Sequence, residues 1–395
     1  MATTNFSALT TYQKKTWSRD VWHTARQNSF VMQMAGKGPN TAIQRITELT
    51  KSDRGTQAVV TLVADLANEG AMGDYSIEGS EEAIKAYDQQ VQIDQIRNAN
   101  KIAGRVAEQK SIVKFRETSR DVLGFWLANI VDELAFNTLS GIDYRIKPNG
   151  ATRTGFTGTG VGTYSRTATV GYALYDLSFA ADVTAPSTKR YFRWNGTTKV
   201  LTTGSTTTVA AADTPSYAML VAAKAFAKQR RLRSLKAGAG QELYHVFMHP
   251  SSMAKLKLDT DFLANVRNAG VRGDSNSLFS GAIMTVDGLV IHENINVFNT
   301  LGATTGTVTN QGWPGWKWGT NADVDGAHVL LCGAQALAFV DLGAPEWVER
   351  DHFDYGNTPG IAVGKLIGFK KPVFYAPYEA GTNEDFGVMV ITTAL

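Results

Sequence analysis

Residues 111–139, SIVKFRETSRDVLGFWLANIVDELAFNTL, predict one long helix. Large apolar side chains recur three, four or seven residues apart, a spacing that places them on one helical face; they are Phe115, Val122, Leu123, Trp126, Ile130 and Leu134. No proline interrupts the run, and Gly141 suits a C-cap. Such a helix spans roughly 40 Å at about 1.5 Å per residue. Because no second stretch is as long, we expect a spine that carries other layers, with Trp126 packed against the sheet of its own chain.

The segment before this helix, residues 55–100, predicts an extended β-hairpin. TQAVVTLVADL is rich in β-branched residues and VQIDQI alternates apolar with polar residues, so each indicates a strand. The stretch between them bears several glycines and is acidic, and its carboxylates are Glu69, Asp74, Glu78, Glu81 and Glu82. A two-stranded hairpin is marginally stable alone in water. We therefore expect these five residues to contact a basic surface on another copy of the chain.

The other segments complete an α+β pattern. Residues 1–54 contain a short amphipathic stretch with little core of its own, so we expect an arm that lies on other parts of the fold or on another chain. Residues 142–215 are rich in Gly and Thr, and Asn195-Gly196 between RYFRW and TTKVL predicts a hairpin, which indicates a small β insertion. Residues 216–337 alternate helical and strand patterns, and residues 338–395 end within a strand pattern.

Composition excludes several classes of protein. Hydrophobic residues make up 43% of the 395 residues and charged residues 19%, which is typical of a folded chain. A net charge of +3 is too small to indicate a dedicated nucleic-acid binder. The single cysteine, Cys332, excludes an internal disulfide and fits a reducing compartment. The sequence has neither a signal peptide nor an apolar run of membrane-spanning length, so a soluble cytosolic protein without membrane contact is expected.

No motif with a chemical mechanism is present. The chain lacks GxSxG, a Walker A loop, a GxGxxG after a strand, and CxxC. His245 and His249 lie roughly 13 Å apart on a strand at about 3.3 Å per residue, too far for one metal ion. His352 lies between Asp351 and Asp354, which fits a surface hydrogen-bond network better than a catalytic site. We therefore expect no enzymatic activity, no catalytic residue, no cofactor and no metal.

A cluster of cations lies near the end of the helix predicted over residues 216–235. Its members are Lys224, Lys228, Arg230, Arg231, Arg233 and Lys236. Cations are favoured near a helix C-terminus by the helix dipole. An acidic partner or a polyanion is the alternative explanation.

Several stretches, in order along the chain, resemble the major capsid proteins of tailed phages with the HK97-like fold. They are NEGAMGDYSIEGSEEAIKAYDQQVQIDQIRNA, the helix from SIVKFRE to TLSG, YHVFMHPSSMAKLK, SLFSGAIMTVDGLVIHEN, LLCGAQALAFV and DYGNTPGIAVGKLIGFKKPVF. Their order and number make the resemblance specific, and it extends from about Ala35 to the C-terminus.

The resemblance implies a division of the chain into named parts. They are an N-terminal arm (1–54), an extended hairpin or E-loop (55–100), the spine helix of a peripheral domain (101–141), a β-rich insertion (142–215), an axial domain (216–337) and the return strands of the peripheral domain (338–395). The insertion departs from the minimal fold of the family.

The resemblance also implies a function. The chain is expected to self-assemble into hexamers and pentamers of an icosahedral phage head that encloses double-stranded DNA. It would reside in the host cytoplasm before assembly and in the virion afterwards. Because the sequence shows no long, charged, helical extension before the arm, a separate scaffolding protein is implied, together with a portal, and a decoration protein is compatible with the fold. Contact with the packaged DNA would be weak and non-specific.

Two alternatives remain at the level of the sequence. An encapsulin-type nanocompartment shell shares the fold and encloses a cargo enzyme instead of DNA. An enzyme with an unrecognised site is the second alternative, and it would form a small closed oligomer rather than a particle. Covalent cross-linking between subunits, which involves a lysine, an asparagine and a carboxylate, is left open; Lys85 lies in the hairpin.

Overall fold

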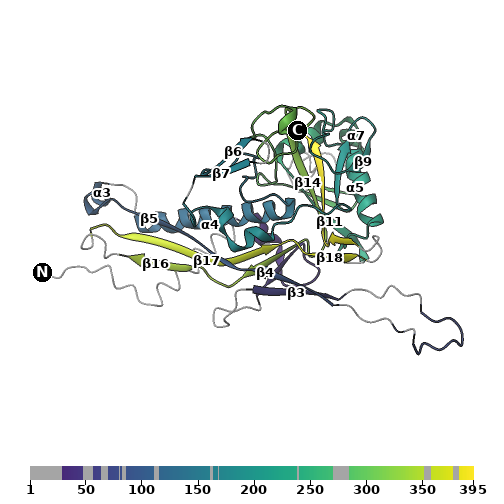
Figure 1. Cartoon of the computed structure of the whole chain (residues 1–395), viewed down its shortest axis with the longest axis horizontal. Coiled ribbons are helices and arrows are strands. Elements are labelled where there is room, and N and C mark those ends of the chain that lie inside the picture. Colours follow the sequence, from purple (N-terminus) through teal and green to yellow (C-terminus); the bar gives the residue numbers. More distant parts are fainter. Residues whose placement is uncertain are drawn as a thin grey trace.

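The computed structural model describes residues 29–47, 57–63, 70–79, 81, 86–110, 115–160, 163–167, 169–237, 240–269, 284–350, 357–376 and 382–395. Within these ranges the chain forms two sheets that share one long helix, and a two-stranded ribbon runs away from the body (Figure 1). The helices are α2 (Phe30–Met34), α3 (Arg105–Lys110), α4 (Phe115–Ser140), α5 (Tyr217–Gln229), α6 (Pro250–Leu258) and α7 (Thr260–Ala269), with 3₁₀ turns η1 (Leu174–Asp176), η2 (Ser178–Asp182) and η4 (Val308–Asn310).

The larger sheet has eight strands. In order they are β12 (Met284–Val286), β13 (Leu289–Glu293), β11 (Glu242–Met248), β14 (Gly326–Cys332), β20 (Val388–Ala394), β8 (Tyr191–Asn195) and β9 (Val200–Thr203), with β10 (Leu235–Lys236) paired to β11. Every residue of β14 and β20 is buried. Both strands are largely apolar, as is typical of central strands that are covered on both faces.

The smaller sheet has six strands and lies along α4 (Figure 1). Its order is β1 (Ala35–Gly36), β2 (Ile43–Ile46), β15 (Leu337–Asp341), β17 (Gly360–Lys370) and β16 (Glu346–Arg350), and β5 (Asp94–Lys101) also pairs with β17. Three short ribbons complete the strands: β3 (Gln57–Val63) with β4 (Ala86–Gln92), β6 (Phe156–Gly160) with β7 (Thr163–Arg166), and β18 (Val373–Ala376) with β19 (Thr382–Asp385).

The spine helix is confirmed as α4, and it ends as predicted at Gly141. This glycine has φ +67°, and its N–H donates to the Thr138 carbonyl at 3.1 Å. An added Cβ would lie 2.6 Å from the Thr184 carbonyl oxygen, so both the backbone conformation and the space require glycine. The main hydrophobic core includes Leu127, Val131 and Leu134 of α4 together with residues of both sheets. The helix therefore joins the two sheets through a shared core.

The predicted apolar stripe is partly wrong. Val122 is 50% exposed, although we assigned it to the core face, and the neighbouring Phe125 is 49% exposed. Trp126 is half-buried and packs against the rim of the core in its own chain. The buried face instead follows Leu123 and Leu127. The error has a simple cause: apolar residues occur all around the middle of this helix, so their spacing alone does not select one face.

Asp132 of α4 is buried and anchors the N-terminal segment. Its carboxylate accepts hydrogen bonds from the Ser29 hydroxyl at 2.6 Å and from the backbone N–H groups of Phe30 at 2.9 Å and Val31 at 3.0 Å. Asp132 thus satisfies donors at the start of α2 that no residue within that short helix can satisfy. Burial raises the pKa of Asp132, and these hydrogen bonds oppose the shift.

Strand pairing differs from the predicted boundaries in two places. The hairpin at Asn195-Gly196 is confirmed as β8 and β9, but these strands extend the larger sheet rather than forming a separate unit, because Val390 of β20 pairs in parallel with Tyr191 of β8. The C-terminal strand β20 lies between β14 and β8, whereas we assigned residues 338–395 to the peripheral domain. Both differences come from pairing between segments far apart in the chain.

Two buried lysine–aspartate pairs connect distant segments. Lys365 on β17 donates to the Asp341 carboxylate at 2.6 Å, and Arg45 on β2 binds the same carboxylate. Lys371, just after β17, lies 2.9 Å from the Asp385 carboxylate at the end of β19, and neither side chain is exposed. These pairs join the N-terminal and C-terminal segments to the smaller sheet.

Candidate functional site

The predicted extended hairpin is confirmed, and its tip lies at one end of the long axis of the molecule (Figure 1). β3 and β4 pair antiparallel from Gln57↔Gln92 to Val63↔Ala86. Of the five predicted contact residues, Asp74, Glu78 and Glu81 are described and exposed; Glu69 and Glu82 lie outside the described residues. The structure therefore brings three of the predicted carboxylates together on one projecting tip.

The conformation of the tip is encoded locally. Gly70, Gly73 and Gly79 have φ of +78°, +65° and +88°, a region that other residues rarely adopt. Glu81 accepts a hydrogen bond from the Gly79 N–H at 2.8 Å. The Glu78 N–H donates to the Ser76 hydroxyl at 3.1 Å. The tip is thus a shaped loop that presents its side chains outward.

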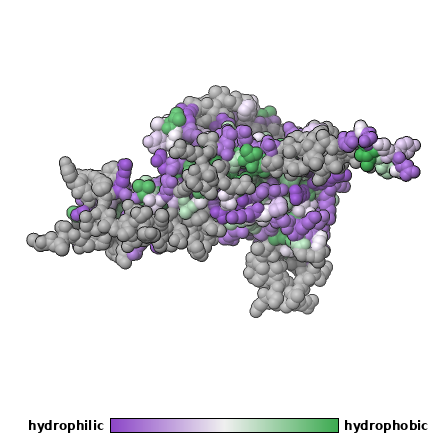
Figure 2. Space-filling model, turned by 90° about the horizontal axis from the view of Figure 1, so that it is seen from below, coloured by the Kyte–Doolittle hydropathy of each residue, from purple (hydrophilic) through white to green (hydrophobic). Residues whose placement is uncertain are grey.

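Sequence reasoning missed the apolar part of this surface. Met72, Tyr75 and Ile77 alternate with the acidic residues and are 65%, 84% and 59% exposed. Figure 2 shows hydrophobic and hydrophilic atoms side by side at the projecting end. Large exposed apolar side chains gathered in one place mark a contact surface. The sequence did contain a signal for this apolar surface: bulky apolar residues lie within a loop that is otherwise acidic and rich in glycine.

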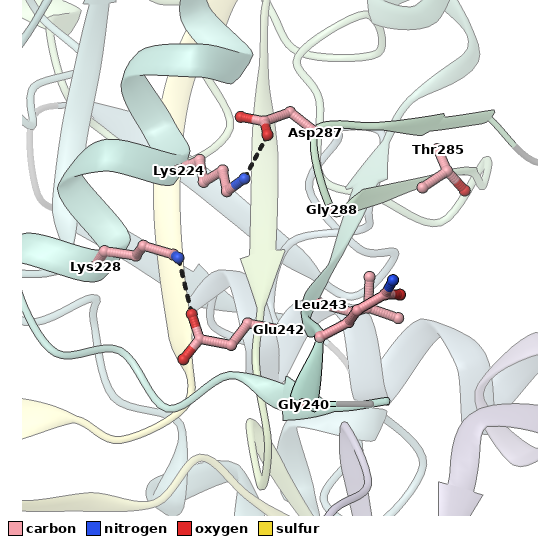
Figure 3. A pocket seen from close by; sticks show the side chains of 9 residues that line it. Lys224, Lys228, Gly240, Glu242, Leu243, Thr285, Asp287 and Gly288 are labelled. Atoms are coloured by element: carbon pink, nitrogen blue, oxygen red, sulfur yellow. Dashed lines mark hydrogen bonds and ion pairs between the residues drawn. The ribbon is translucent and has the colours of Figure 1, made fainter. Parts of the chain in front are cut away.

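The basic end of α5 forms an open pocket of ≈ 490 Å³ against the β11 strand and the β12–β13 turn (Figure 3). Lys224 pairs with Asp287 at 2.5 Å and Lys228 pairs with Glu242 at 2.8 Å. The hydrogen bond between Lys228 and Glu242 raises the pKa of the lysine and lowers that of the carboxylate. Each of these two lysines therefore has a carboxylate of its own chain beside it.

Two of the histidines that the structure describes contact each other. His245 Nδ1 and His292 Nε2 lie 2.8 Å apart across β11 and β13. Burial lowers the pKa of His292 to about 4 and also lowers that of His245, so both rings are neutral at neutral pH. His249 instead accepts a hydrogen bond from the Ser251 N–H at the start of α6. Asp351, His352 and Asp354 lie outside the described residues.

Within the described part of the chain, no three or more His, Cys, Asp or Glu side chains are grouped to hold a metal ion. None of the helices described combines the length and apolar character that crossing a bilayer requires.

A model of the family described as phage capsid protein matches residues 5–395. The chain belongs to the phage capsid protein family. It is 48% identical over 392 residues to the major capsid protein of Pseudomonas phage KPP25, covering 99% of this chain and 97% of that protein.

The fold agrees with solved capsid structures. The capsid of Ralstonia phage GP4 matches with a TM-score of 0.67 and 25% identity, covering 92% of this chain and 90% of that one. The capsid of cyanophage Pam1 matches with a TM-score of 0.67 at 17% identity, covering 93% and 92%, which supports the fold alone. The predicted α+β, HK97-like capsid fold is confirmed.

These relatives decide between the alternatives. The chain is a phage major capsid protein that forms multimeric shells as part of the virion, and the comparisons support this function over a nanocompartment shell. The family is a structural one, in keeping with the lack of a catalytic motif in the sequence.

Proposed function

We propose that this capsid protein assembles into hexamers and pentamers of an icosahedral head that encloses double-stranded DNA, and that the hairpin tip is one of its contacts between subunits. The observation that carries the proposal is the hairpin itself. The base of this ribbon packs on the smaller sheet, where Ala58 and Val91 join a core with Ile46, Ala338 and Val340. Its tip instead projects at one end of the long axis of the molecule and carries exposed acidic and apolar side chains (Figure 1). A neighbouring subunit supplies the missing surface.

The proposal includes other partners. A separate scaffolding protein directs assembly in the host cytoplasm, a portal occupies one vertex, and the added residues between 142 and 215 offer exterior surface for a decoration protein. The packaged DNA is contacted weakly and through phosphates alone, because a net charge of +3 gives the chain only a small overall attraction for a polyanion. The E-loop, peripheral and axial assignments of the predicted segments belong to this proposal.

Assembly is the first test. Co-expression of the chain with its scaffolding protein is expected to give hollow icosahedral particles in the megadalton range, seen by negative-stain microscopy and light scattering. A homogeneous monomer or dimer under these conditions would contradict the proposal.

Charge reversal at the tip tests the contact. A variant with Asp74→Lys, Glu78→Lys and Glu81→Lys is expected to fold normally, since all three side chains are exposed, yet to lose most of its particle yield. A matched control reverses three exposed carboxylates elsewhere: Asp261, Glu293 and Asp323. Circular dichroism of unassembled subunits and the yield of sedimenting particles are the measurements. Equal yields from the tip variant and the native chain would exclude the tip as a contact.

A further inference from the structure

The loop between β7 and η1 holds two large side chains in solvent. Val170 is 76% exposed and Tyr172 is 86% exposed. We call residues 169–173, TVGYA, the insertion loop; none of its five side chains is charged. Large apolar and aromatic side chains that are exposed together mark a contact surface.

The carboxylate of Asp176 fixes the shape of the insertion loop. It accepts hydrogen bonds from the backbone N–H groups of Gly171 at 2.8 Å and Ala173 at 3.3 Å. Arg166 binds the same carboxylate through two N–H groups, at 2.5 Å and 2.8 Å, and also donates to the Thr169 carbonyl at 3.1 Å. The loop is therefore held in one shape before any partner binds, which lowers the entropy cost of binding.

The insertion loop and α5 lie on opposite faces of the larger sheet. Leu174 and Tyr175, directly after the loop, pack against the core that contains Phe247 and α4. Leu220 of α5 packs in a second core with Val246. Val246 and Phe247 are neighbours in β11, and side chains alternate across a strand, so the two cores lie on opposite faces. The β6–β7 ribbon and α5 accordingly lie on opposite sides of this part of the molecule, with β14 between them (Figure 1).

The side that bears α5 offers a recess, which we call the α5 pocket. It has a volume of ≈ 490 Å³, and Leu243, Thr285 and Gly288 line it together with two lysines of α5 (Figure 3). Pockets of about 300–1,000 Å³ hold small ligands, so this one has room for an aromatic side chain. Val221 lies one turn before Lys224 on the same side of α5 and is 43% exposed, which extends the apolar lining onto the helix.

The charges of the α5 pocket are matched with one another. Lys224 pairs with Asp287, and Lys228 pairs with Glu242 (Figure 3). A neutral occupant leaves both pairs intact, whereas a charged occupant would compete with them. A tyrosine suits such a site, because its ring attracts an ammonium group and its hydroxyl finds a polar partner. The acidic hairpin tip suits it less, because it would bring further carboxylates beside Asp287 and Glu242.

We propose that the insertion loop of one subunit docks into the α5 pocket of the next copy of this chain. Tyr172 enters the pocket and Val170 contacts the exposed side of α5. The inference rests on the proposed assembly into rings of subunits, and it adds a contact to that of the hairpin tip. A second copy is the occupant because the chain forms multimeric shells and carries both halves of the contact. Since the halves lie on opposite faces of one sheet, the contact is head-to-tail and closes a ring when the rotation between copies permits.

Truncation of the insertion loop tests its part in assembly. Val170→Ala combined with Tyr172→Ala is expected to leave a folded subunit, because both side chains are exposed. Particle yield is expected to fall at least about tenfold, as for an aromatic residue that anchors an interface. The matched control truncates two exposed apolar residues elsewhere, Ile295→Ala with Val308→Ala, and is expected to assemble normally. Circular dichroism of unassembled subunits and the yield of sedimenting particles are the measurements.

Cross-linking within assembled particles identifies the receiving surface. The native chain has a single cysteine, Cys332, which is buried, so only introduced cysteines react with a short bismaleimide. Thr169→Cys and Thr285→Cys change exposed side chains and leave Tyr172 in place. A chain with both changes is expected to give a ladder of covalent multimers on a denaturing gel, and each single variant is expected to stay monomeric. The control pairs Thr169→Cys with Val122→Cys on α4, on the other face of the larger sheet, and is expected to give no ladder.

The outcomes separate this inference from the proposed function. A ladder from the chain with cysteines at 169 and 285, but none from the α4 control, supports docking of the loop in the α5 pocket. Particles that give no ladder overturn the inference while the proposed assembly stands, and a ladder from the α4 control overturns it as well. A truncated loop that assembles normally but no longer binds a decoration protein would assign the loop to that partner instead. Failure of the native chain to form particles would contradict the proposed function itself.

Discussion

Replacing Lys371 by methionine is expected to lower the free energy of unfolding of the subunit by about 3–5 kcal/mol, because it leaves the Asp385 carboxylate buried without its cation. The ammonium group lies 2.9 Å from Asp385 Oδ2, which also accepts the Ser187 N–H at 3.0 Å. Arg190 donates to the Asp385 backbone carbonyl at 3.2 Å. This pair thus holds the segment before β8 against the hairpin of β18 and β19.

The pKa shifts of Lys371 and Asp385 show that burial opposes the charged form of both groups. Burial raises the pKa of Asp385 and lowers that of Lys371, so each group is displaced toward its neutral form. Loss of hydration therefore outweighs the attraction between the two charges. Replacing both residues by apolar ones of similar size (Lys371→Met with Asp385→Leu) is expected to be far less harmful than the single change, since no charge is then left buried.

Urea unfolding of unassembled subunits measures these differences. Lys224→Met is the control, because its partner Asp287 is 54% exposed and loses little when the lysine is removed. A Lys371→Met subunit as stable as the control would show that the buried pair does not hold the two segments together.

Truncating Leu127 to alanine is expected to lower the free energy of unfolding by about 2–5 kcal/mol, enough to make the subunit insoluble or misfolded. Leu127 is fully buried in the core that α4 shares with both sheets. Phe125→Ala, two residues away, is expected to leave a folded subunit because the ring is 49% exposed. Trp126→Ala, at the rim of the core, should fall between the two.

Solubility and circular dichroism of the three variants give the ranking. If Phe125→Ala damaged folding as strongly as Leu127→Ala, the orientation of α4 in the structure would be contradicted. If Phe125→Ala folded but failed to assemble, the exposed side of the helix would be a contact between subunits as well.

The sequence alone determined the long helix, its end at Gly141, the extended hairpin with its acidic tip, and the family. Each of these depends on local chemistry: helical spacing, a residue that tolerates positive φ, β-branched strands and a run of carboxylates. The two strands around Asn195-Gly196 were predictable for the same reason. The order of several weak resemblances along the chain then indicated a capsid protein, although no single stretch carried a mechanism.

Only the tertiary structure decided which face of α4 is buried, why Asp132 is buried, and which strands lie side by side. Apolar residues surround the middle of α4, so the two sheets that pack on it select Leu127 over Val122. Asp132 carries a charged side chain, which by itself predicts exposure. It is buried because its carboxylate accepts hydrogen bonds from residues 29–31, about one hundred residues away in the chain. β20 joins β8, and Gly364 joins Arg97 and Glu346 in one row, through pairings that no local pattern encodes. Contacts between distant segments depend on the packing of the whole chain.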